Sequence, residues 1–276
     1  MTTIHVAHSP DSDDAYMFYA LAFGKIDTEG LTYVHELQDI ETLNQRAMRG
    51  ELEVTAVSIH AYAYLSDRYA LLPHGASMGD RYGPRLVARS PMSRSDLRGK
   101  RIAIPGKLTS AYLALRLFEP DFEPVVTPFD QIEDAVMRGD VDVGLLIHEG
   151  QLTFADNGLH LIQDLGEWWF GETGLPLPLG GNVIRKDLGE TMTRKISRHL
   201  HDSIAYGLDH RTAALDHSMQ YARGLDRSKA GTFVGMYVND WTLDYGERGR
   251  EAVRLFLERG VKAGVIEKTI TVEFVD

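Results

Sequence analysis

The 276-residue sequence contains no cysteine at all. This absence excludes disulfides, thiolate nucleophiles, iron–sulfur clusters and cysteine-ligated zinc. Long apolar runs are also missing, since no stretch approaches the ~18 consecutive apolar residues of a membrane-spanning helix. The first residues show no basic segment followed by an apolar one, so no secretory signal peptide is visible. We therefore expect a soluble, cytoplasmic protein with no membrane partner.

Basic residues are in the minority, with 29 Lys and Arg against 40 Asp and Glu, which gives a formal net charge of −11. This acidic balance argues against a nucleic-acid partner, because such binding depends on a basic surface. The hydrophobic fraction of 43% and the charged fraction of 25% are ordinary for a globular protein. The length predicts one or two domains with a large core.

Strand-like and helix-like segments alternate along the chain. Short apolar stretches predict strands at residues 4–7, 31–37, 52–57, 101–104 and 125–127. Between them, amphipathic stretches predict helices at residues 15–23, 41–49 and 110–118. This alternation predicts an α/β protein and argues against a helical bundle or a β-sandwich.

One sequence pattern occurs twice. Met-Arg-Gly-Glu-Leu-Glu-Val at 48–54 is echoed by Met-Arg-Gly-Asp-Val-Asp-Val at 137–143. Either the echo arises by chance, or the chain has two similar lobes in which a helix ends at Arg-Gly and a strand follows. The second interpretation places Ser58 and His148 near the carboxyl ends of corresponding strands, where open α/β sheets bind ligands. We expect a cleft between the lobes at these strand ends.

The same interpretation gives the domain boundaries. We expect residues 1–88 together with 182–276 to form lobe one, and residues 89–181 to form lobe two, with two crossovers between them. Residues 182–185 are expected to return to lobe one as a strand. Apolar residues spaced by four predict a helix over 192–208, a second helix is expected over 247–259 and ends at Gly260, and residues 270–275 suggest a closing strand.

The segment Thr109-Ser110-Ala111 follows a predicted strand and opens a helix. Its free backbone N–H groups and hydroxyls could receive an anion, such as a carboxylate or a phosphate. The alternative is ordinary helix capping, because Ser and Thr are preferred N-cap residues. The spacing of a P-loop is absent.

His148 ends an apolar strand and is followed by Glu149. An imidazole there could face the cleft and act as a general base, and Glu149 could orient it. The alternative is a structural, hydrogen-bonded histidine. The metalloprotease pattern His-Glu-x-x-His fails because Leu152 occupies the second histidine position. We favour His60 less, because it is expected inside a helix. His5, His35, His201, His210 and His217 are interpreted as surface or helix-face residues.

Two further segments have a functional and a structural interpretation. The acidic turn Asp11-Ser12-Asp13-Asp14 could bind a cation, but a solvated helix cap is the favoured interpretation. The segment Trp168-Trp169-Phe170 could stack on a ring-shaped substrate, but packing in the core or between the lobes is favoured.

Several motifs together resemble one family. They are Ser9-Pro10 with Asp14, Pro105-Gly106 with Ser110-Ala111-Tyr112, Ile147-His148-Glu149, and Gly-Leu-Pro-Leu-Pro-Leu-Gly at 174–180. This set resembles the 1,4-dihydroxy-6-naphthoate synthases of the futalosine route to menaquinone, and the resemblance covers essentially the whole chain.

The resemblance implies a fold, a reaction and a site. The fold is that of type II periplasmic binding proteins, with two α/β lobes, two crossovers and a cleft. The reaction converts cyclic dehypoxanthine futalosine, a small anionic nucleoside-derived substrate, into 1,4-dihydroxy-6-naphthoate without a metal or an organic cofactor. By resemblance, His148 is the catalytic base, and the substrate-binding positions are Asp14, Ala56, Val57, Ser58, Thr109, Ser110 and Ala111.

One departure bears on the substrate. Members of the family commonly have Cys-Pro-Asn where this chain has Asp11-Ser12-Asp13, and a carboxylate facing an anionic ligand would repel it. Two alternatives stay open: a chorismate dehydratase of the same pathway, and a solute-binding protein that uses the cleft without chemistry.

Overall fold

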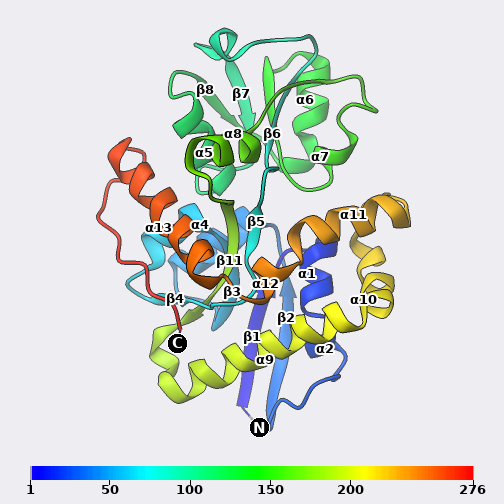
Figure 1. The fold of residues 1–276 in the computed structure, drawn as a ribbon, viewed down its shortest axis with the longest axis vertical. Coiled ribbons are helices and arrows are strands. Elements are labelled where there is room, and N and C mark those ends of the chain that lie inside the picture. The colour runs from blue at the N-terminus through cyan, green and yellow to red at the C-terminus, as the bar shows by residue number, and fades with distance from the viewer. Residues whose placement is uncertain (1, 276) are drawn as a thin grey trace.

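Two separate β-sheets organise residues 2–275, which the computed structural model describes (Figure 1). The first sheet has the order β2-β1-β3-β11-β4, and β5 also pairs with β11. Strands β1, β2 and β3 are parallel, whereas β11 runs antiparallel to its neighbours. The strands are β1 (Thr2–His8), β2 (Leu31–Leu37), β3 (Val54–Ser58), β4 (Tyr69–Leu71), β5 (Ser77–Gly79) and β11 (Leu177–Arg185).

The second sheet lies in the other lobe and has the order β10-β6-β9-β7-β8. Its central strand β9 is parallel to β7 and antiparallel to β6. The strands are β6 (Arg85–Ala88), β7 (Arg101–Ile104), β8 (Glu123–Val126), β9 (Val143–Leu146) and β10 (His160–Asp164). The chain thus has two α/β lobes, as the alternating pattern predicts.

Helices cover both sheets. The first lobe carries α1 (Ser12–Met17), α2 (Tyr19–Ala22), α3 (Ile40–Met48), α4 (Ile59–Leu65), α9 (Glu190–Asp209), α10 (Arg211–Ser218), α11 (Arg227–Tyr237), α12 (Asp240–Leu243) and α13 (Gly246–Lys262). The second lobe carries α5 (Ser110–Phe118), α6 (Ile132–Arg138), α7 (Gly150–Thr153) and α8 (Leu165–Thr173). Short 3₁₀ turns lie at η1 (Arg94–Leu97), η2 (Phe129–Gln131), η3 (Lys186–Leu188) and η4 (Met219–Tyr221).

The repeated pattern marks equivalent places in the two lobes. In the first copy α3 ends next to Gly50 and leads into β3, and in the second α6 ends at Gly139 and leads into β9. Both glycines are left-handed, with φ of 70° and 81°, a conformation that glycine adopts at little cost. The prediction that a helix feeds a strand in both copies is confirmed.

Three predicted elements were wrong in detail. The helix expected at 15–23 begins at Ser12 and is interrupted at Phe18, so α1 and α2 are separate. Gly260 does not end α13, which continues to Lys262. Residues 270–275 form no extended strand. Within this segment a single bridge, from Phe274 to Leu71, pairs with the edge of the first sheet.

The chain passes between the lobes twice. The first crossing joins β5 to β6, and the second joins α8 to β11, which runs back into the first sheet (Figure 1). The boundary after residue 88 and the boundary before residue 182 stay predictions. In the structure β6 belongs to the second sheet, and β11 enters the first sheet at Leu177.

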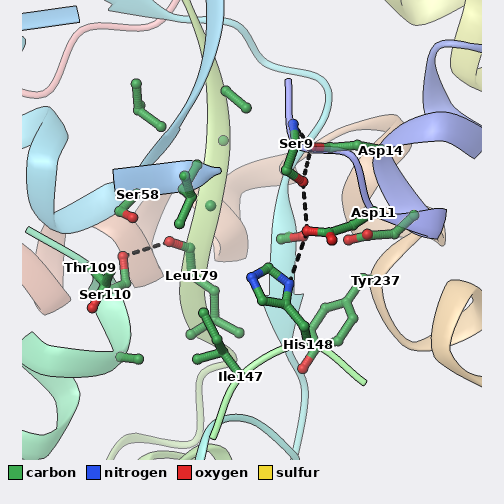
Figure 2. Close-up of a pocket in the computed structure, with 18 of the residues that line it drawn as sticks. Ser9, Asp11, Asp14, Ser58, Thr109, Ser110, Ile147, His148, Leu179 and Tyr237 are labelled. Carbon is green, nitrogen blue, oxygen red and sulfur yellow. Dashed lines mark hydrogen bonds and ion pairs between the residues drawn. The ribbon is translucent and has the colours of Figure 1, made fainter. Parts of the chain in front are cut away.

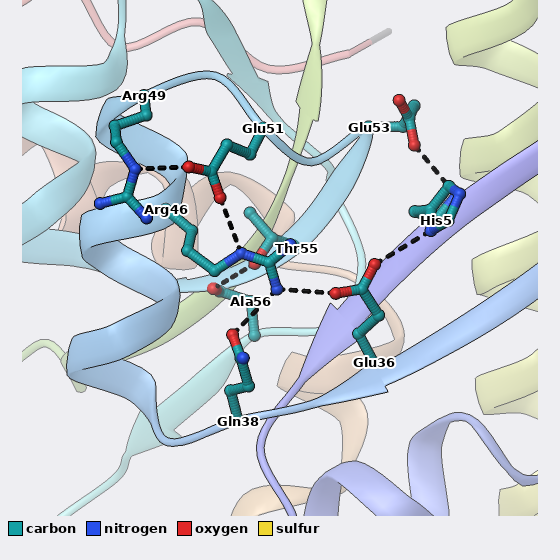
Figure 3. A network of polar contacts seen from close by, with 9 residues as sticks. All are labelled: His5, Glu36, Gln38, Arg46, Arg49, Glu51, Glu53, Thr55 and Ala56. Carbon is teal, nitrogen blue, oxygen red and sulfur yellow. Dashed lines mark hydrogen bonds and ion pairs between the residues drawn. The ribbon is translucent and has the colours of Figure 1, made fainter.

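A polar network holds α3 against the first sheet (Figure 3). Arg46 of α3 donates to Glu36 at 2.7 Å and to Glu51 at 2.9 Å, and His5 contacts Glu36 at 3.0 Å. Such half-exposed ion pairs stabilise a protein only modestly. These ion pairs fix the position of α3 against the sheet. This matters because α3 also carries the buried Asn44, which binds Ser58 at the end of β3.

Within residues 2–275, no helix is both long enough and apolar enough to cross a membrane.

Candidate functional site

A cavity lies between the lobes, with an empty volume of about 770 Å³ that includes open solvent at its mouth. Its lining comes from the ends of β3 and β9, the N-terminal turns of α1 and α5, the middle of β11 and helix α11. All the site residues predicted from the sequence line it: Asp14, Ala56, Val57, Ser58, Thr109, Ser110, Ala111 and His148. The structure therefore brings them together, whereas their roles stay predictions.

One end of the cavity presents hydrogen-bond donors. Thr109 caps α5, since its hydroxyl oxygen accepts the N–H of Tyr112 at 3.2 Å. The N–H groups of Ser110 and Ala111 lie in the first turn, where a helix has no carbonyl of its own to offer them. These N–H groups and the positive end of the helix dipole make this end suitable for an anion.

Of the two serines at this end, one has already donated its hydroxyl hydrogen within the protein, whereas the other can still donate its own to a ligand. Ser110 donates its hydroxyl hydrogen to the carbonyl of Leu179 at 2.5 Å and accepts the N–H of His60 at 3.1 Å (Figure 2). Ser58 accepts from the amide of Asn44 at 3.1 Å, and this bond leaves the Ser58 hydroxyl hydrogen unused. Ser110 therefore offers a ligand its backbone N–H, and Ser58 its hydroxyl.

The opposite end of the cavity carries His148, just beyond the end of β9. Its Nδ1 lies 3.1 Å from Oδ2 of Asp11, and its other ring nitrogen is turned toward the side of Ser110 (Figure 2). The side chain is 18% exposed. The ring of Phe129 meets the His148 ring edge-on, with centroids 4.8 Å apart.

The acidic turn is buried, so the expected solvated cap is wrong. Asp11, Asp13 and Asp14 are only 1%, 9% and 8% exposed, and all three line the cavity. Ser9 holds the turn together, because its hydroxyl lies 2.7 Å from both Asp11 and Asp14. The alternative cation site finds no support among residues 2–275, where no group of three or more His, Asp or Glu is arranged to hold a metal ion.

Burial changes the protonation of these acids. It raises the pKa of Asp14 to about 6, and the hydrogen bonds from Ser9 oppose this shift. It also raises the pKa of Asp13 well above its usual range, with the neighbouring Asp14 and Asp11 adding to the effect. Burial likewise raises the pKa of Glu149. Asp13, Asp14 and Glu149 therefore favour their neutral forms more than free carboxyl groups do.

Glu149, which could have oriented the imidazole, forms no hydrogen bond with it. The partner of the His148 ring is Asp11, and Oε1 of Glu149 is buried without a hydrogen-bond partner among the described residues. His60 is the second residue of α4, where its Nδ1 lies 3.3 Å from the Thr109 carbonyl and burial lowers its pKa to about 4.

Some lining residues gave no local signal in the sequence. Tyr237 on α11 and Gln151 on α7 come from different lobes, and their side chains meet at 2.8 Å beside the acidic turn. Only the packing of α11 across the mouth of the cleft reveals them. In the aromatic segment, Trp169 is a core residue, fully buried, and donates to the carbonyl of Pro176 at 3.1 Å, whereas Trp168 and Phe170 are half-buried.

The backbone of His148 is left-handed, with φ of 56°, which is costly for a residue with a side chain. We expect His148→Gly to be more stable than His148→Ala by about 1 kcal/mol, because glycine adopts this conformation without strain. Chemical denaturation of the two variants measures the difference. At the exposed, helical Ala213, exchange for glycine should act in the opposite direction. Equal stability of the two His148 variants would show that the position is unstrained.

Asp14→Asn should change how stability depends on pH. The folded-state pKa of about 6 lies above the usual value of 3.8, so the folded protein holds this proton more tightly than the unfolded chain does. The stabilisation is present below about pH 4 and is lost as the pH rises through about 6. Relative to wild type, the Asp14→Asn variant should gain about 3 kcal/mol across this window, at about 1.4 kcal/mol per pKa unit. Denaturation at several pH values measures the gain, and the exposed Asp134→Asn should show none.

The sequence matches known proteins over nearly its whole length. A family model described as menaquinone biosynthesis matches residues 4–262. A 1,4-dihydroxy-6-naphthoate synthase from Thermus thermophilus is 41% identical over 95% of this chain and 97% of its own length. A synthase of the same name from Streptomyces coelicolor is 37% identical over 96% of this chain and 95% of its own length.

Solved structures show the same fold. A protein from Archaeoglobus fulgidus is 50% identical, with a TM-score of 0.92, over 96% of this chain and 98% of its own. An alkanesulfonate-binding protein from Xanthomonas axonopodis is only 12% identical, yet has a TM-score of 0.71 over 99% of this chain and 96% of its own. The two lobes, the two crossovers and the cleft are thus those of periplasmic binding proteins.

Proposed function

Because the chain belongs to the menaquinone-biosynthesis family of 1,4-dihydroxy-6-naphthoate synthases, we propose that it converts cyclic dehypoxanthine futalosine into 1,4-dihydroxy-6-naphthoate, with His148 as general base. The reaction makes it a carbon–carbon lyase of the futalosine pathway. The observation that carries the proposal is the position of His148 at one end of the cavity, opposite the donors of α5.

The donor end holds the carboxylate of the substrate. The N–H groups of Ser110 and Ala111 and the hydroxyl of Ser58 face the cavity at the N-terminal turn of α5, where the helix dipole favours negative charge. This local arrangement acts against the net charge of −11 of the whole chain. The anionic group and the acidic turn therefore lie at opposite ends of the bound molecule.

The imidazole of His148 removes a proton from the substrate and so starts the cleavage of a carbon–carbon bond. The ring nitrogen that is free of Asp11 faces the cavity and accepts this proton. At the same end, burial raises the pKa of Asp13, which reduces the negative charge of this carboxyl group and so its repulsion of an anionic substrate.

The remaining assignments follow from this reaction. The substrate is a small anionic, nucleoside-derived molecule, and residues from both lobes line the cavity that would receive it. The mechanism requires neither a metal nor an organic cofactor. We place the protein in the cytoplasm, where the pathway operates, and assign it no nucleic-acid or membrane partner.

Incubation of the purified protein with cyclic dehypoxanthine futalosine tests the proposal. We expect catalytic release of 1,4-dihydroxy-6-naphthoate, detected by chromatography and mass spectrometry. Stoichiometric binding without product would instead identify a solute-binding protein. Turnover of chorismate, with none of the cyclic substrate, would identify a chorismate dehydratase. Either of these two results would overturn the proposed function.

A further inference from the structure

Asp11 is the one acidic side chain among the described residues that contacts the His148 ring. Its Oδ2 lies 3.1 Å from Nδ1, and the carboxylate is 2% exposed, so water competes little for this contact. Asp14 and Glu149 also influence the ring electrostatically, but neither forms a hydrogen bond or ion pair with it. A carboxylate in this position fixes an imidazole with its proton on Nδ1 and its lone pair on Nε2.

The carboxylate of Asp11 is itself held from two sides. The hydroxyl of Ser9 lies 2.7 Å from Oδ2, as close as it lies to Asp14, and the guanidinium of Arg223 pairs with Oδ1. Arg223 also lies over the ring of Phe129, 4.4 Å from its centroid, and Phe129 in turn packs edge-on against His148. Four side chains, Asp11, His148, Phe129 and Arg223, therefore form a closed ring of contacts.

This ring of contacts joins the two lobes. Asp11 precedes α1, and Arg223 lies between η4 and α11, both in the first lobe. His148 follows β9, and Phe129 begins η2, both in the second lobe. The Asp11–His148 contact therefore depends on how the two lobes sit relative to each other.

We propose that Asp11 is a positioning residue for the reaction. This inference rests on the proposed role of His148 as the base. Asp11 keeps the Nε2 lone pair of His148 directed at the substrate and stabilises the positive ring that forms when the proton arrives. Arg223 keeps the Asp11 carboxylate in place.

Asp11→Asn is the variant that tests this role, because it keeps the shape of the side chain and removes its charge. We expect kcat to fall by about 10²-fold or more, as for other imidazoles that lose their carboxylate. KM should change little, because the lost interaction acts in the transition state. Arg223→Gln should give a smaller loss of kcat, since Ser9 still holds the carboxylate. Asp130→Asn is the matched control, because Asp130 is exposed and adjoins Phe129.

Nitrogen NMR of wild-type protein labelled at histidine gives a second measurement that does not depend on how Asp11→Asn folds. We expect His148 to carry its proton on Nδ1, and we expect this signature to weaken in Asp11→Asn. The opposite tautomer in the wild type would overturn the proposal, as would wild-type kcat in Asp11→Asn.

The NMR result also separates this inference from the proposed function. If the protein releases no naphthoate, or if His148→Ala retains full activity, the proposed function fails. The Nδ1 signature then still reports whether Asp11 positions the ring. If His148→Ala is inactive and Asp11→Asn is fully active, the proposed role of His148 as base is supported and the positioning role of Asp11 is contradicted.

Discussion

His148→Ala is expected to lower kcat for naphthoate formation by about 10²–10⁴-fold, the usual contribution of a positioned acid–base group. The imidazole lies at the end of the cavity opposite the donors, and no other histidine lines that cavity among the described residues. The change leaves untouched the donors of α5 that we propose bind the substrate carboxylate, so KM should stay close to that of the wild type. Steady-state kinetics with the cyclic substrate measures both constants.

The matched control is His160→Ala, because His160 is exposed at the start of β10 and lies outside the cavity. This variant should retain wild-type kinetics. Thermal unfolding of both variants shows whether a rate loss comes from misfolding. A folded His148→Ala protein with near-normal kcat would remove His148 from the role of base, whatever product the wild type forms.

Gly166→Ala is expected to destabilise the protein by about 3 kcal/mol or more, through a clash that cannot be relieved locally. A methyl group at Gly166 would come within 1.8 Å of the carbonyl oxygen of Tyr82 and 2.1 Å of its carbon. These are backbone atoms of the first crossing between the lobes, so relief requires the crossing to move away from α8. Chemical denaturation measures the loss.

Gly171→Ala, on the same helix, provides the control. A methyl group at Gly171 would have none of the described atoms beyond its own helix within 4 Å, and the residue is exposed. This substitution should stabilise the protein by about 0.5–1 kcal/mol, because alanine favours helices over glycine. If the two substitutions prove equally tolerated, the close approach of the crossing to α8 does not hold in solution.

The two-lobed fold and one end of the site could be predicted from local patterns. The echo at 48–54 and 137–143 marked where helices end and strands begin, because Gly50 and Gly139 both adopt the left-handed conformation that ends a helix. The helix N-terminus at Thr109-Ser110-Ala111 could be predicted because the residues that cap a helix are neighbours in the sequence. Both signals depend only on neighbours along the chain.

The other end of the site depends on contacts between distant segments. In the sequence, Asp11 looks like part of a solvated turn. In the structure it pairs with His148 and with Arg223, which lies more than two hundred residues later in the chain. Similarly, Ser110 looks like a free hydroxyl until the carbonyl of Leu179 on the returning strand takes its hydrogen. No local pattern contains the pairing of a buried acid with its distant partners, which is why burial reversed the interpretation of the turn.

The division of the Asp11–His148 pair between two lobes has a consequence for substitutions outside the cavity. Because Asp11 and His148 come from different lobes, the 3.1 Å distance between them is set by how the lobes sit relative to each other, and not by the local backbone of either residue. A substitution at either crossing between the lobes that changes their relative position would therefore change this distance without altering any residue that lines the cavity. Such a substitution should affect the Asp11–His148 pair in the same direction as Asp11→Asn.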